Sequence, residues 1–268
     1  MISWIGGKSK ISKWIIPFIP KDVETYVEPM SGAFWVYLTM DLNDYKNLNT
    51  IVYNDYNKYL TNLFVCCKEH EYFSKYIKDI KVQDEKLFYE FQNDLNKYED
   101  FDIPDYDNAL KFSYLTTQVF SGISPLNGKF IDLKGKYKSK FDTFRDKLVN
   151  KKFTDKLDKI TNFENLDFEE CIKKYDSEKT FNYVDAPYYR TEHYYSNHDF
   201  GLDDHKRLAD TLKSIKGKFA MSYYYFGDLE KWFPKDKYRW ESKDFVKAAS
   251  AKSGIKQNKG TELLIMNY

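Results

Sequence analysis

Short apolar runs separated by longer stretches of mixed polarity form the main pattern along the 268-residue chain. Helical periodicity fills most of the intervals between these runs. Because parallel strands need crossover connections, this alternation predicts an α/β domain with a doubly wound, mostly parallel sheet and helices on both faces. The runs rich in β-branched and aromatic residues, which we expect to be strands, are residues 25–27, 50–53, 180–184, 218–222 and 262–266.

One long stretch between the second and third expected strands departs from this alternation. Residues 59–162 are charged, rich in aromatic residues and helical in pattern, and apolar residues recur at helical spacing within residues 87–95. Such spacing is more typical of a buried helix face than of a binding site. We therefore expect an α/β domain built from residues 1–58 and 163–268, interrupted by a helical insertion at residues 59–162.

Composition changes this picture in one respect, the uneven distribution of charge. The formal net charge is only +1, but residues 84–107 hold nine acidic residues and two lysines. Residues 129–152 hold nine basic residues against three aspartates, and residues 235–259 hold eight basic residues against three acidic ones. Each basic run fits either a solvated surface or a contact with nucleic-acid phosphates.

The cysteines and the hydropathy of the chain argue against a disulfide-rich protein, a zinc protein and a membrane-spanning protein. Cys66, Cys67 and Cys171 cannot form a disulfide framework or a zinc site, and the four histidines lack metal-ligand spacing. No stretch has the length of a membrane span, and the amino end shows no signal-peptide pattern. We expect a soluble cytoplasmic protein with no membrane partner and no metal.

A strand followed by a glycine turn near the amino end is typical of a nucleotide-binding corner. The turn contains Gly32, and Asp55 ends the next expected strand, 23 residues later. In nucleotide-binding α/β folds, an acidic residue about 20 residues beyond the glycine turn accepts hydrogen bonds from ribose hydroxyls. Asp55 fits that role. Phe34 stands where a second glycine would be, so a cofactor without a pyrophosphate fits this turn better than a dinucleotide does.

The expected strand at residues 180–184 leads into Asp185-Ala186-Pro187-Tyr188 at the ligand-binding edge of the sheet. The exocyclic amine of adenine is a poor nucleophile, so a catalyst must accept its N–H hydrogens and hold the nitrogen in line with a methyl group. Asp185 and the carbonyl of Ala186 offer two such acceptors. Tyr188 can stack on a base flipped out of a duplex, and Pro187 restrains the loop. The tetrapeptide alone also fits a strand that ends in a polar turn with a structural proline.

Six motifs occur along the chain in a fixed order, and together they indicate a protein family more specifically than any one of them does. The series resembles the D12-class, or Dam-like, DNA adenine N6-methyltransferases over almost the whole chain. This resemblance implies a Rossmann-like methyltransferase fold and site-specific transfer of a methyl group from S-adenosylmethionine to N6 of an adenine flipped out of double-stranded DNA. The motifs are Trp4-Ile-Gly-Gly-Lys8, Glu28-Pro-Met-Ser-Gly32, Asn54-Asp55-Tyr-Asn57, Asp167-Phe168, Asp185-Ala-Pro-Tyr188 and Glu262-Leu-Leu-Ile-Met-Asn-Tyr268.

The resemblance also implies residue roles. The Gly32 turn would approach the methionine part of the cofactor, and Asp55 would hold its ribose. Asp185 would accept from the target amine, and Tyr188 would stack on the target base. Asp167 and Phe168 would bracket the adenine of the cofactor. The full set of implied cofactor-binding residues is Trp4, Lys8, Glu28, Gly32, Asp55, Asp167, Phe168 and Asp185.

In this family the helical insertion is the target-recognition domain, which gives residues 59–162 the task of reading DNA and leaves catalysis to residues 1–58 and 163–268. A basic and aromatic tract within the insertion could follow the phosphate backbone. Residues 121–127 are a candidate reading loop. The expected phosphate-binding residues are Lys129, Lys134, Lys136, Lys138 and Lys140.

Three positions depart from the usual pattern of the family. Ala186 replaces a proline, so the loop keeps its carbonyl and loses stiffness, and we expect an altered rate and not a different reaction. Met30 and Phe34 replace a usual Phe and a usual Gly, which bears on cofactor affinity. Two alternatives stay open: a relative that binds DNA without turnover, and a methyltransferase acting on RNA adenine or on cytosine N4.

Overall fold

The computed structural model of the chain describes residues 2, 4, 6–95, 100–119, 122, 125–135, 137–189, 200–246 and 259–268. These residues form two compact units, and each is described by itself. The unit that we call the helical unit comprises Asn57–Asn165 together with the described residues up to Gly7. The second, called the α/β unit, comprises Lys8–Tyr56 and Leu166–Tyr268.

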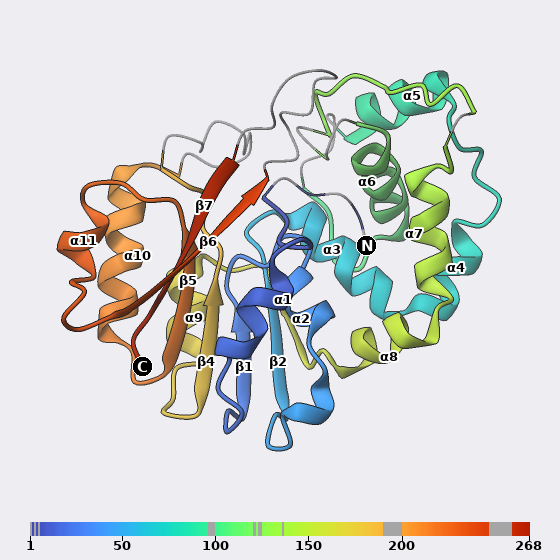
Figure 1. Cartoon of the computed structure of the whole chain (residues 1–268). Helices are drawn as coiled ribbons and strands as arrows, with labels where there is room; N and C mark the ends of the chain where they lie inside the picture. The colour runs from blue at the N-terminus through green and yellow to red at the C-terminus, as the bar shows by residue number, and fades with distance from the viewer. Residues whose placement is uncertain are drawn as a thin grey trace. The chain divides into compact units, whose positions relative to one another are not determined.

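The sheet has seven strands in the order β3-β2-β1-β4-β5-β7-β6 (Figure 1). Strand β1 pairs in parallel with β2 and with β4, and β4 pairs in parallel with β5. Strand β7 runs antiparallel between β5 and β6. The mostly parallel α/β fold expected from the sequence is confirmed. The strands are β1 (Thr25–Glu28), β2 (Thr50–Asn54), β3 (Asn162–Glu164), β4 (Thr180–Val184), β5 (Lys218–Tyr223), β6 (Arg239–Val246) and β7 (Lys259–Met266).

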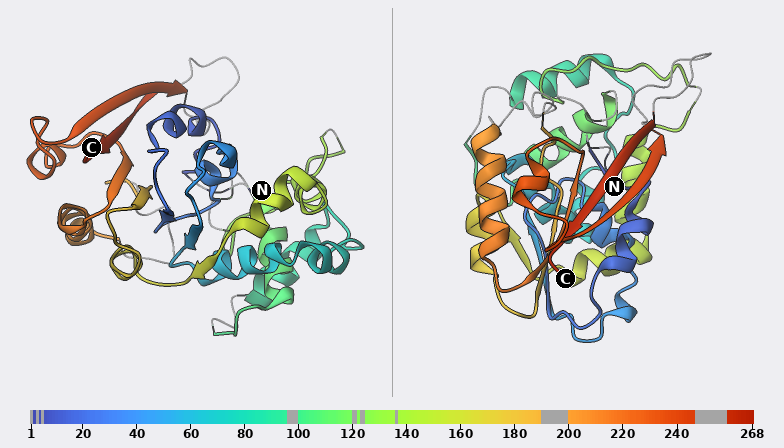
Figure 2. Two further views of the ribbon diagram at one scale, coloured as in Figure 1. Left: turned by 90° about the horizontal axis from the view of Figure 1, so that it is seen from below. Right: turned by 60° about the vertical axis from the view of Figure 1, so that its left-hand side comes forward.

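Helices cover both faces of the sheet in the α/β unit. Helices α1 and α2 lie on one face, and α9 and α10 lie on the other (Figure 2). This arrangement follows from the parallel pairing, because each crossover must return over a face of the sheet. The elements are α1 (Ser12–Ile15), α2 (Trp35–Thr39), α9 (Phe168–Lys174), α10 (Leu202–Ser214), α11 (Leu229–Trp232) and the 3-10 turns η1 (Ile16–Phe18) and η2 (Leu42–Asp44).

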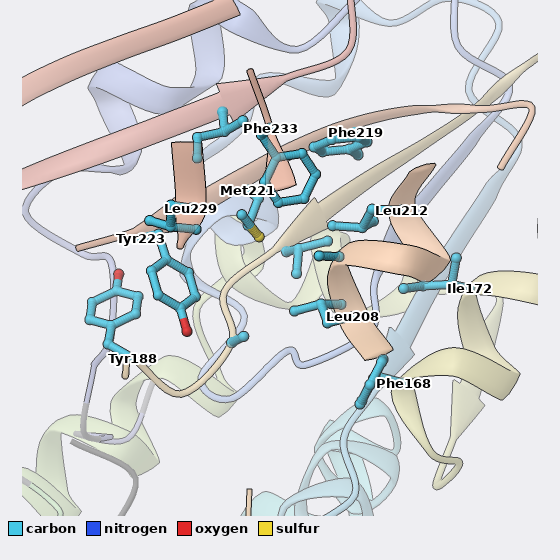
Figure 3. Close-up of a cluster of buried hydrophobic side chains, with 14 residues drawn as sticks. Phe168, Ile172, Tyr188, Leu208, Leu212, Phe219, Met221, Tyr223, Leu229 and Phe233 are labelled. Carbon is cyan, nitrogen blue, oxygen red and sulfur yellow. The ribbon is translucent and has the colours of Figure 1, made fainter. Parts of the chain in front are cut away.

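A buried apolar cluster fills the space between α9, α10 and the strands β4 and β5. Leu208 and Leu212 of α10 pack there with Phe219 and Met221 of β5. Figure 3 shows Tyr188 and Tyr223 beside each other at one end of the cluster. The cluster therefore connects the main core of this unit to the end of the Asp185–Tyr188 tetrapeptide.

The helical unit is built around packed aromatic side chains. Helix α5 carries the apolar residues that the helical spacing in residues 87–95 indicated, and Phe88 and Leu95 on it are buried. Tyr59 stacks on Phe112 with ring centroids 5.3 Å apart. The helices are α3 (Lys58–Lys68), α4 (His70–Tyr76), α5 (Glu85–Leu95), α6 (Tyr106–Gln118), α7 (Lys140–Leu148) and α8 (Lys151–Lys159).

None of the described helices is both long and apolar enough to cross a membrane. Among the residues that the structure describes, no three or more His, Cys, Asp or Glu side chains gather in a way that could hold a metal ion. Cys66, Cys67 and Cys171 are buried free thiols.

Candidate active site

The carboxyl ends of β1 and β4 lie side by side at one edge of the sheet, because these strands pair in parallel with Val27 opposite Asn182. Strand order reverses between them: the chain runs from β1 outward to β2 on one side and reaches β4 and β5 on the other. Open α/β sheets bind ligands at such a reversal, outside the carboxyl ends of the strands. Glu28 ends β1, and Asp185 directly follows β4.

Four polar side chains from distant parts of the sequence meet at this edge. The Lys8 ammonium Nζ lies 2.5 Å from Oδ1 of Asp185 and 3.5 Å from Oε1 of Glu262. The Tyr188 hydroxyl lies 3.3 Å from the same Asp185 oxygen and is also hydrogen-bonded to Glu262 Oε1. The structure thus brings together three residues predicted for the site, Lys8, Asp185 and Tyr188, and adds Glu262.

Burial strongly affects the charges in this group. Loss of hydration raises the pKa of Asp185, an effect that the nearby Lys8 ammonium partly opposes. Burial likewise raises the pKa of Glu262, and the negative charge of Asp185 adds to the increase, while Lys8 opposes it. For Lys8, burial favours the neutral form, but attraction by the two carboxylates outweighs it and raises the pKa. The single buried ammonium of Lys8 therefore interacts electrostatically with two carboxyl groups.

The Tyr188 ring, predicted to stack on the target base, lies among other aromatic rings. Only 8% of the residue is exposed. Its centroid is 4.2 Å from that of Tyr224 and 5.3 Å from that of Tyr223, and the Lys8 ammonium lies 4.9 Å from the ring centre. With its hydroxyl and its ring both in contact, Tyr188 is held from two sides.

The loop that contains Ala186 and Pro187 is held by tertiary contacts. The Tyr223 hydroxyl donates to the Pro187 carbonyl at 3.3 Å and is also hydrogen-bonded to Nδ1 of the buried His205. Ala186 is itself buried within the apolar cluster. Packing and hydrogen bonds therefore support the segment in which Ala186 replaces the first of the two prolines that are usual in the family.

The glycine turn after β1 carries the local geometry expected of a ligand-binding corner. Gly32 has φ of +52°, a left-handed conformation that glycine adopts without steric cost. Its amide donates to Oδ2 of Asp55 at 2.8 Å, and its carbonyl accepts from the Tyr53 hydroxyl at 2.9 Å. The two sequence-predicted residues, Gly32 and Asp55, are thus in direct contact.

Glu28 lies at the same edge but is bonded within the protein. Its Oε1 accepts from the Tyr26 hydroxyl at 2.6 Å and from the Tyr37 amide at 3.0 Å. Burial raises the pKa of this carboxyl to about 8. These contacts connect Glu28 of β1 to the backbone of α2. The cofactor contact expected for Glu28 stays a prediction.

Asn54, at the end of β2, is hydrogen-bonded to two neighbouring segments at this edge. Its side-chain amide donates to the carbonyls of Pro29 at 2.7 Å and Leu166 at 3.1 Å, and its Oδ1 accepts from the Leu166 amide at 2.9 Å. Asn54 is completely buried. It therefore fixes the segment that leads into Asp167 relative to the turn after β1.

Asp167 and Phe168, expected to bracket the adenine of the cofactor, lie together with Arg207 of α10. The guanidinium forms a two-pronged contact with the Asp167 carboxylate, at 2.6 and 2.9 Å, and lies 4.1 Å from the centre of the Phe168 ring. Phe168 is 5% exposed and belongs to the apolar cluster. Asp167 also caps α9 by accepting from the Glu169 amide.

The remaining predicted residues lie in the helical unit. Trp4 packs near Phe112, with ring centroids 6.0 Å apart. The exposed side chains among the predicted phosphate-binding residues are Lys129, Lys134, Lys138 and Lys140, whereas Lys136 lies outside the described residues. Lys138 forms an ion pair with Asp146. Of the expected reading loop, the structure describes only residues 122 and 125–127.

Sequence reasoning assigned no role to two residues that now stand out. Glu262 was part of a family motif, and its signal was a single carboxylate directly before a run of apolar strand residues. A carboxylate within an apolar strand must either reach solvent at the strand end or be buried with a polar partner. Glu262 is buried, and its partners are Lys8 and Tyr188. Arg207 had no signal, because one arginine in an amphipathic helix is ordinary.

The chain is similar in sequence to known proteins. The sequence profile of the D12 class N6 adenine-specific DNA methyltransferases matches residues 4–260. The chain belongs to this family. The resemblance carried by the six ordered motifs is thereby confirmed, as is the assignment to DNA adenine methylation.

Two curated relatives resemble this D12-class chain at modest identity. The Type II methyltransferase M.CviBI of Paramecium bursaria Chlorella virus NC1A is 28% identical over 226 residues, which cover 82% of this chain and 81% of the relative. A DNA adenine methylase of Haemophilus influenzae is 27% identical over 243 residues, covering 82% of this chain and 76% of the relative. The similarity thus extends through both units.

Proposed function

We propose that the chain transfers a methyl group from S-adenosylmethionine to N6 of an adenine flipped out of double-stranded DNA, and that Asp185 holds the target amine. The supporting observation is the way Asp185 is bonded. All its hydrogen bonds and its ion pair use Oδ1, and Oδ2 has no hydrogen-bond partner among the residues described. One oxygen orients the carboxylate, and the second is available to accept an N–H hydrogen of adenine.

The chemistry of the proposed site follows from this arrangement. When bound, S-adenosylmethionine supplies an electrophilic methyl group. Oδ2 of Asp185 and the carbonyl of Ala186 accept the two hydrogens of the target amine, which aims the nitrogen lone pair at the methyl carbon. Lys8 and Tyr188 hold Oδ1, so the carboxylate does not need to reorient during the reaction. Tyr188 is proposed to stack on the target base.

The glycine turn and the strand-end carboxylates fit such a cofactor. Gly32 has no Cβ, so a ligand can approach the backbone closely at the turn. Asp55 lies against this turn and is proposed to accept the ribose hydroxyls. Asp167 and Phe168 are proposed to contact the adenine of the cofactor, with Arg207 holding the carboxylate in place. Trp4 and Glu28 retain their predicted cofactor role only as a proposal.

DNA is proposed to contact the exposed lysines of the helical unit. Lys129, Lys134 and Lys140 carry charge at the surface, with Lys136 and Lys138 in the same tract. Ammonium groups of this kind neutralise phosphates without reading the base sequence. This division assigns methyl transfer to the α/β unit and target recognition to the helical unit.

Incubation of the protein with unmethylated plasmid DNA and S-adenosylmethionine carrying a labelled methyl group tests the proposal. We expect label in DNA with the wild-type chain. Asp185→Ala should lower transfer by roughly 100-fold or more, the usual cost of removing a preorganised polar group from a reacting centre. The matched control Asp236→Ala removes an exposed carboxylate from the same unit and should leave transfer unchanged.

Digestion of the labelled DNA to nucleosides identifies the product. N6-methyldeoxyadenosine supports the proposal, whereas labelled N4-methyldeoxycytidine would contradict it. Label that enters RNA and not DNA would also contradict it. A wild-type chain that binds DNA and cofactor but transfers no label would establish a binding protein without turnover.

A further inference from the structure

The Tyr188 hydroxyl has more acceptors than it has hydrogens. It lies in hydrogen-bond contact with Asp185 Oδ1 and with Glu262 Oε1, both of them carboxyl oxygens. A phenol carries one hydrogen, and an ionised carboxylate only accepts. Unless the two oxygens share this one hydrogen, both contacts are hydrogen bonds at the same time only if one of the two carboxyl groups carries a proton and donates it to the phenol oxygen.

The position of Lys8 indicates which carboxyl group carries that proton. Its ammonium lies 2.5 Å from Asp185 but 3.5 Å from Glu262, so it stabilises an ionised Asp185 more strongly. The Glu262 side chain is also less hydrated, with 2% exposed against 20% for Asp185. Both differences favour the ionised form of Asp185 and the protonated form of Glu262.

We propose that Glu262, in its protonated form, is a positioning residue of the methyl-transfer site that donates to Tyr188 and thereby directs the Tyr188 hydroxyl to Asp185. The resulting chain of hydrogen bonds runs from Glu262 to Tyr188 and from Tyr188 to Asp185. It leaves the Asp185 carboxylate ionised and fixed by two donors, Lys8 and Tyr188. This inference rests on the proposed function, because it assigns a role within the same site.

Ionisation of Glu262 would change this arrangement. Tyr188 would turn its hydrogen to the new carboxylate, and Asp185 would lose one of its two donors. The site would also hold two negative charges against one ammonium. Methyl transfer is therefore expected to decline as the pH rises through the range in which Glu262 loses its proton.

The other titratable groups near Glu262 do not explain the expected decline of methyl transfer with rising pH. Burial raises the pKa of Tyr183 and of Tyr224, which favours the neutral form of both phenols. Lys243 lies opposite Glu262 in the β6–β7 pair, but it is exposed and its ammonium is 6.0 Å from the ring of Trp14. Among the described residues, the titratable groups around Glu262 are Lys8, Asp185, Tyr183, Tyr188, Tyr224 and Lys243.

Glu262→Gln and Glu262→Ala distinguish the protonated from the ionised form. A glutamine amide donates to Tyr188 as a protonated carboxyl does, and it cannot ionise. We expect Glu262→Gln to keep most of the wild-type kcat near neutral pH and to lose the wild-type decline at higher pH. Glu262→Ala removes the donor, and kcat should fall on the order of 100-fold, the cost of a misplaced reacting group.

The measurement is kcat and KM on unmethylated plasmid DNA with labelled S-adenosylmethionine, between about pH 6 and 10. Glu178→Gln, an exposed residue just before β4, is the matched control and should follow the wild-type profile. Thermal unfolding of each variant separates a loss of fold from a loss of positioning.

The two variants can overturn the inference in two ways. If Glu262→Gln is as impaired as Glu262→Ala while both unfold at the wild-type temperature, the ionised form is the required one and the inference is wrong. A Glu262→Gln variant that keeps the wild-type decline at high pH also overturns it. Absence of transfer by the wild-type chain would instead contradict the proposed function, so the two failures can be told apart.

Discussion

At the scale of single residues, Glu28 shows how burial changes the pKa of a carboxyl group. The side chain accepts hydrogen bonds from Tyr26 and Tyr37, and burial raises its pKa to about 8. At neutral pH the folded protein therefore holds a proton on Glu28 that the unfolded chain has released. Folding stability must depend on pH through this group.

We predict that Glu28→Gln removes part of that dependence. The unfolded chain releases the proton near the ordinary pKa of 4.5, whereas the folded protein holds it up to about pH 8. The stabilisation due to Glu28 is thus complete below about pH 4.5 and is lost as the pH rises to about 8. Urea unfolding across this range should show the wild-type free energy of unfolding falling relative to Glu28→Gln, by a few kcal/mol. Parallel curves for the two proteins would contradict the raised pKa.

At the scale of an element, the start of α2 shows a conflict between backbone and side chain. Phe34 precedes α2 with φ of +56°, a left-handed conformation that costs a non-glycine residue about 1–2 kcal/mol. The usual family residue here is glycine, which avoids that cost. The Phe34 ring, however, is fully buried, 4.6 Å from Tyr37 and 5.1 Å from Tyr53 between ring centroids.

We predict that the side chain outweighs the strain, so that Phe34→Gly destabilises the fold. Loss of a buried phenylalanine ring costs about 3–5 kcal/mol, and relief of strain returns about 1–2 kcal/mol. Phe34→Ala loses the ring and keeps the strain, so it should be less stable than Phe34→Gly by about 1 kcal/mol. Denaturant unfolding of the three proteins measures both differences. A Phe34→Ala variant as stable as Phe34→Gly would show that the turn is not strained.

The strands show what sequence pattern can and cannot predict. All five predicted strands are present in the structure. They could be predicted because their apolar residues form runs that are flanked by polar residues. Strand β6 was missed: it carries Arg239, Glu241, Lys243 and Asp244, and lies at the outer edge of the sheet, where charged side chains are tolerated. Strand β3 is only three residues long, too short for a periodic signal.

In the candidate site, too, local features could be predicted from the sequence and contacts between distant residues could not. The proximity of Asp185 and Tyr188 was predictable because both lie in one short motif directly after a strand. The contacts of Glu262 and of Arg207 were not, since each depends on a partner far away in the chain, Tyr188 and Asp167 respectively. Only the fold reveals such pairs.

At the scale of the whole molecule, the net charge does not reveal how unevenly the charged residues are distributed along the chain. The chain as a whole is nearly neutral, yet residues 129–152 carry a surplus of basic side chains. In this run Lys129, Lys134 and Lys140 are exposed. If these lysines bind DNA phosphates, each neutralised phosphate releases condensed counterions, and the affinity must depend on salt concentration accordingly.

We predict that the combined change Lys129→Gln, Lys134→Gln and Lys140→Gln weakens binding to all duplex sequences alike. The slope of log affinity against log salt concentration should decrease by about 0.9 for each phosphate that is no longer neutralised, so by about 2–3 in total. Binding of labelled duplex DNA, measured by fluorescence anisotropy at several salt concentrations, gives this slope.

The matched control removes the same charge elsewhere. Lys46→Gln, Lys179→Gln and Lys216→Gln change three exposed lysines of the α/β unit that precede β2, β4 and β5, at the edge opposite the carboxyl ends of these strands. Because a general loss of positive charge would weaken binding equally in both triple variants, an equal decrease in slope would contradict local phosphate binding by the tract. A decrease confined to the first variant, with kcat at saturating DNA unchanged, would show that the tract positions the duplex and that catalysis belongs to residues outside it.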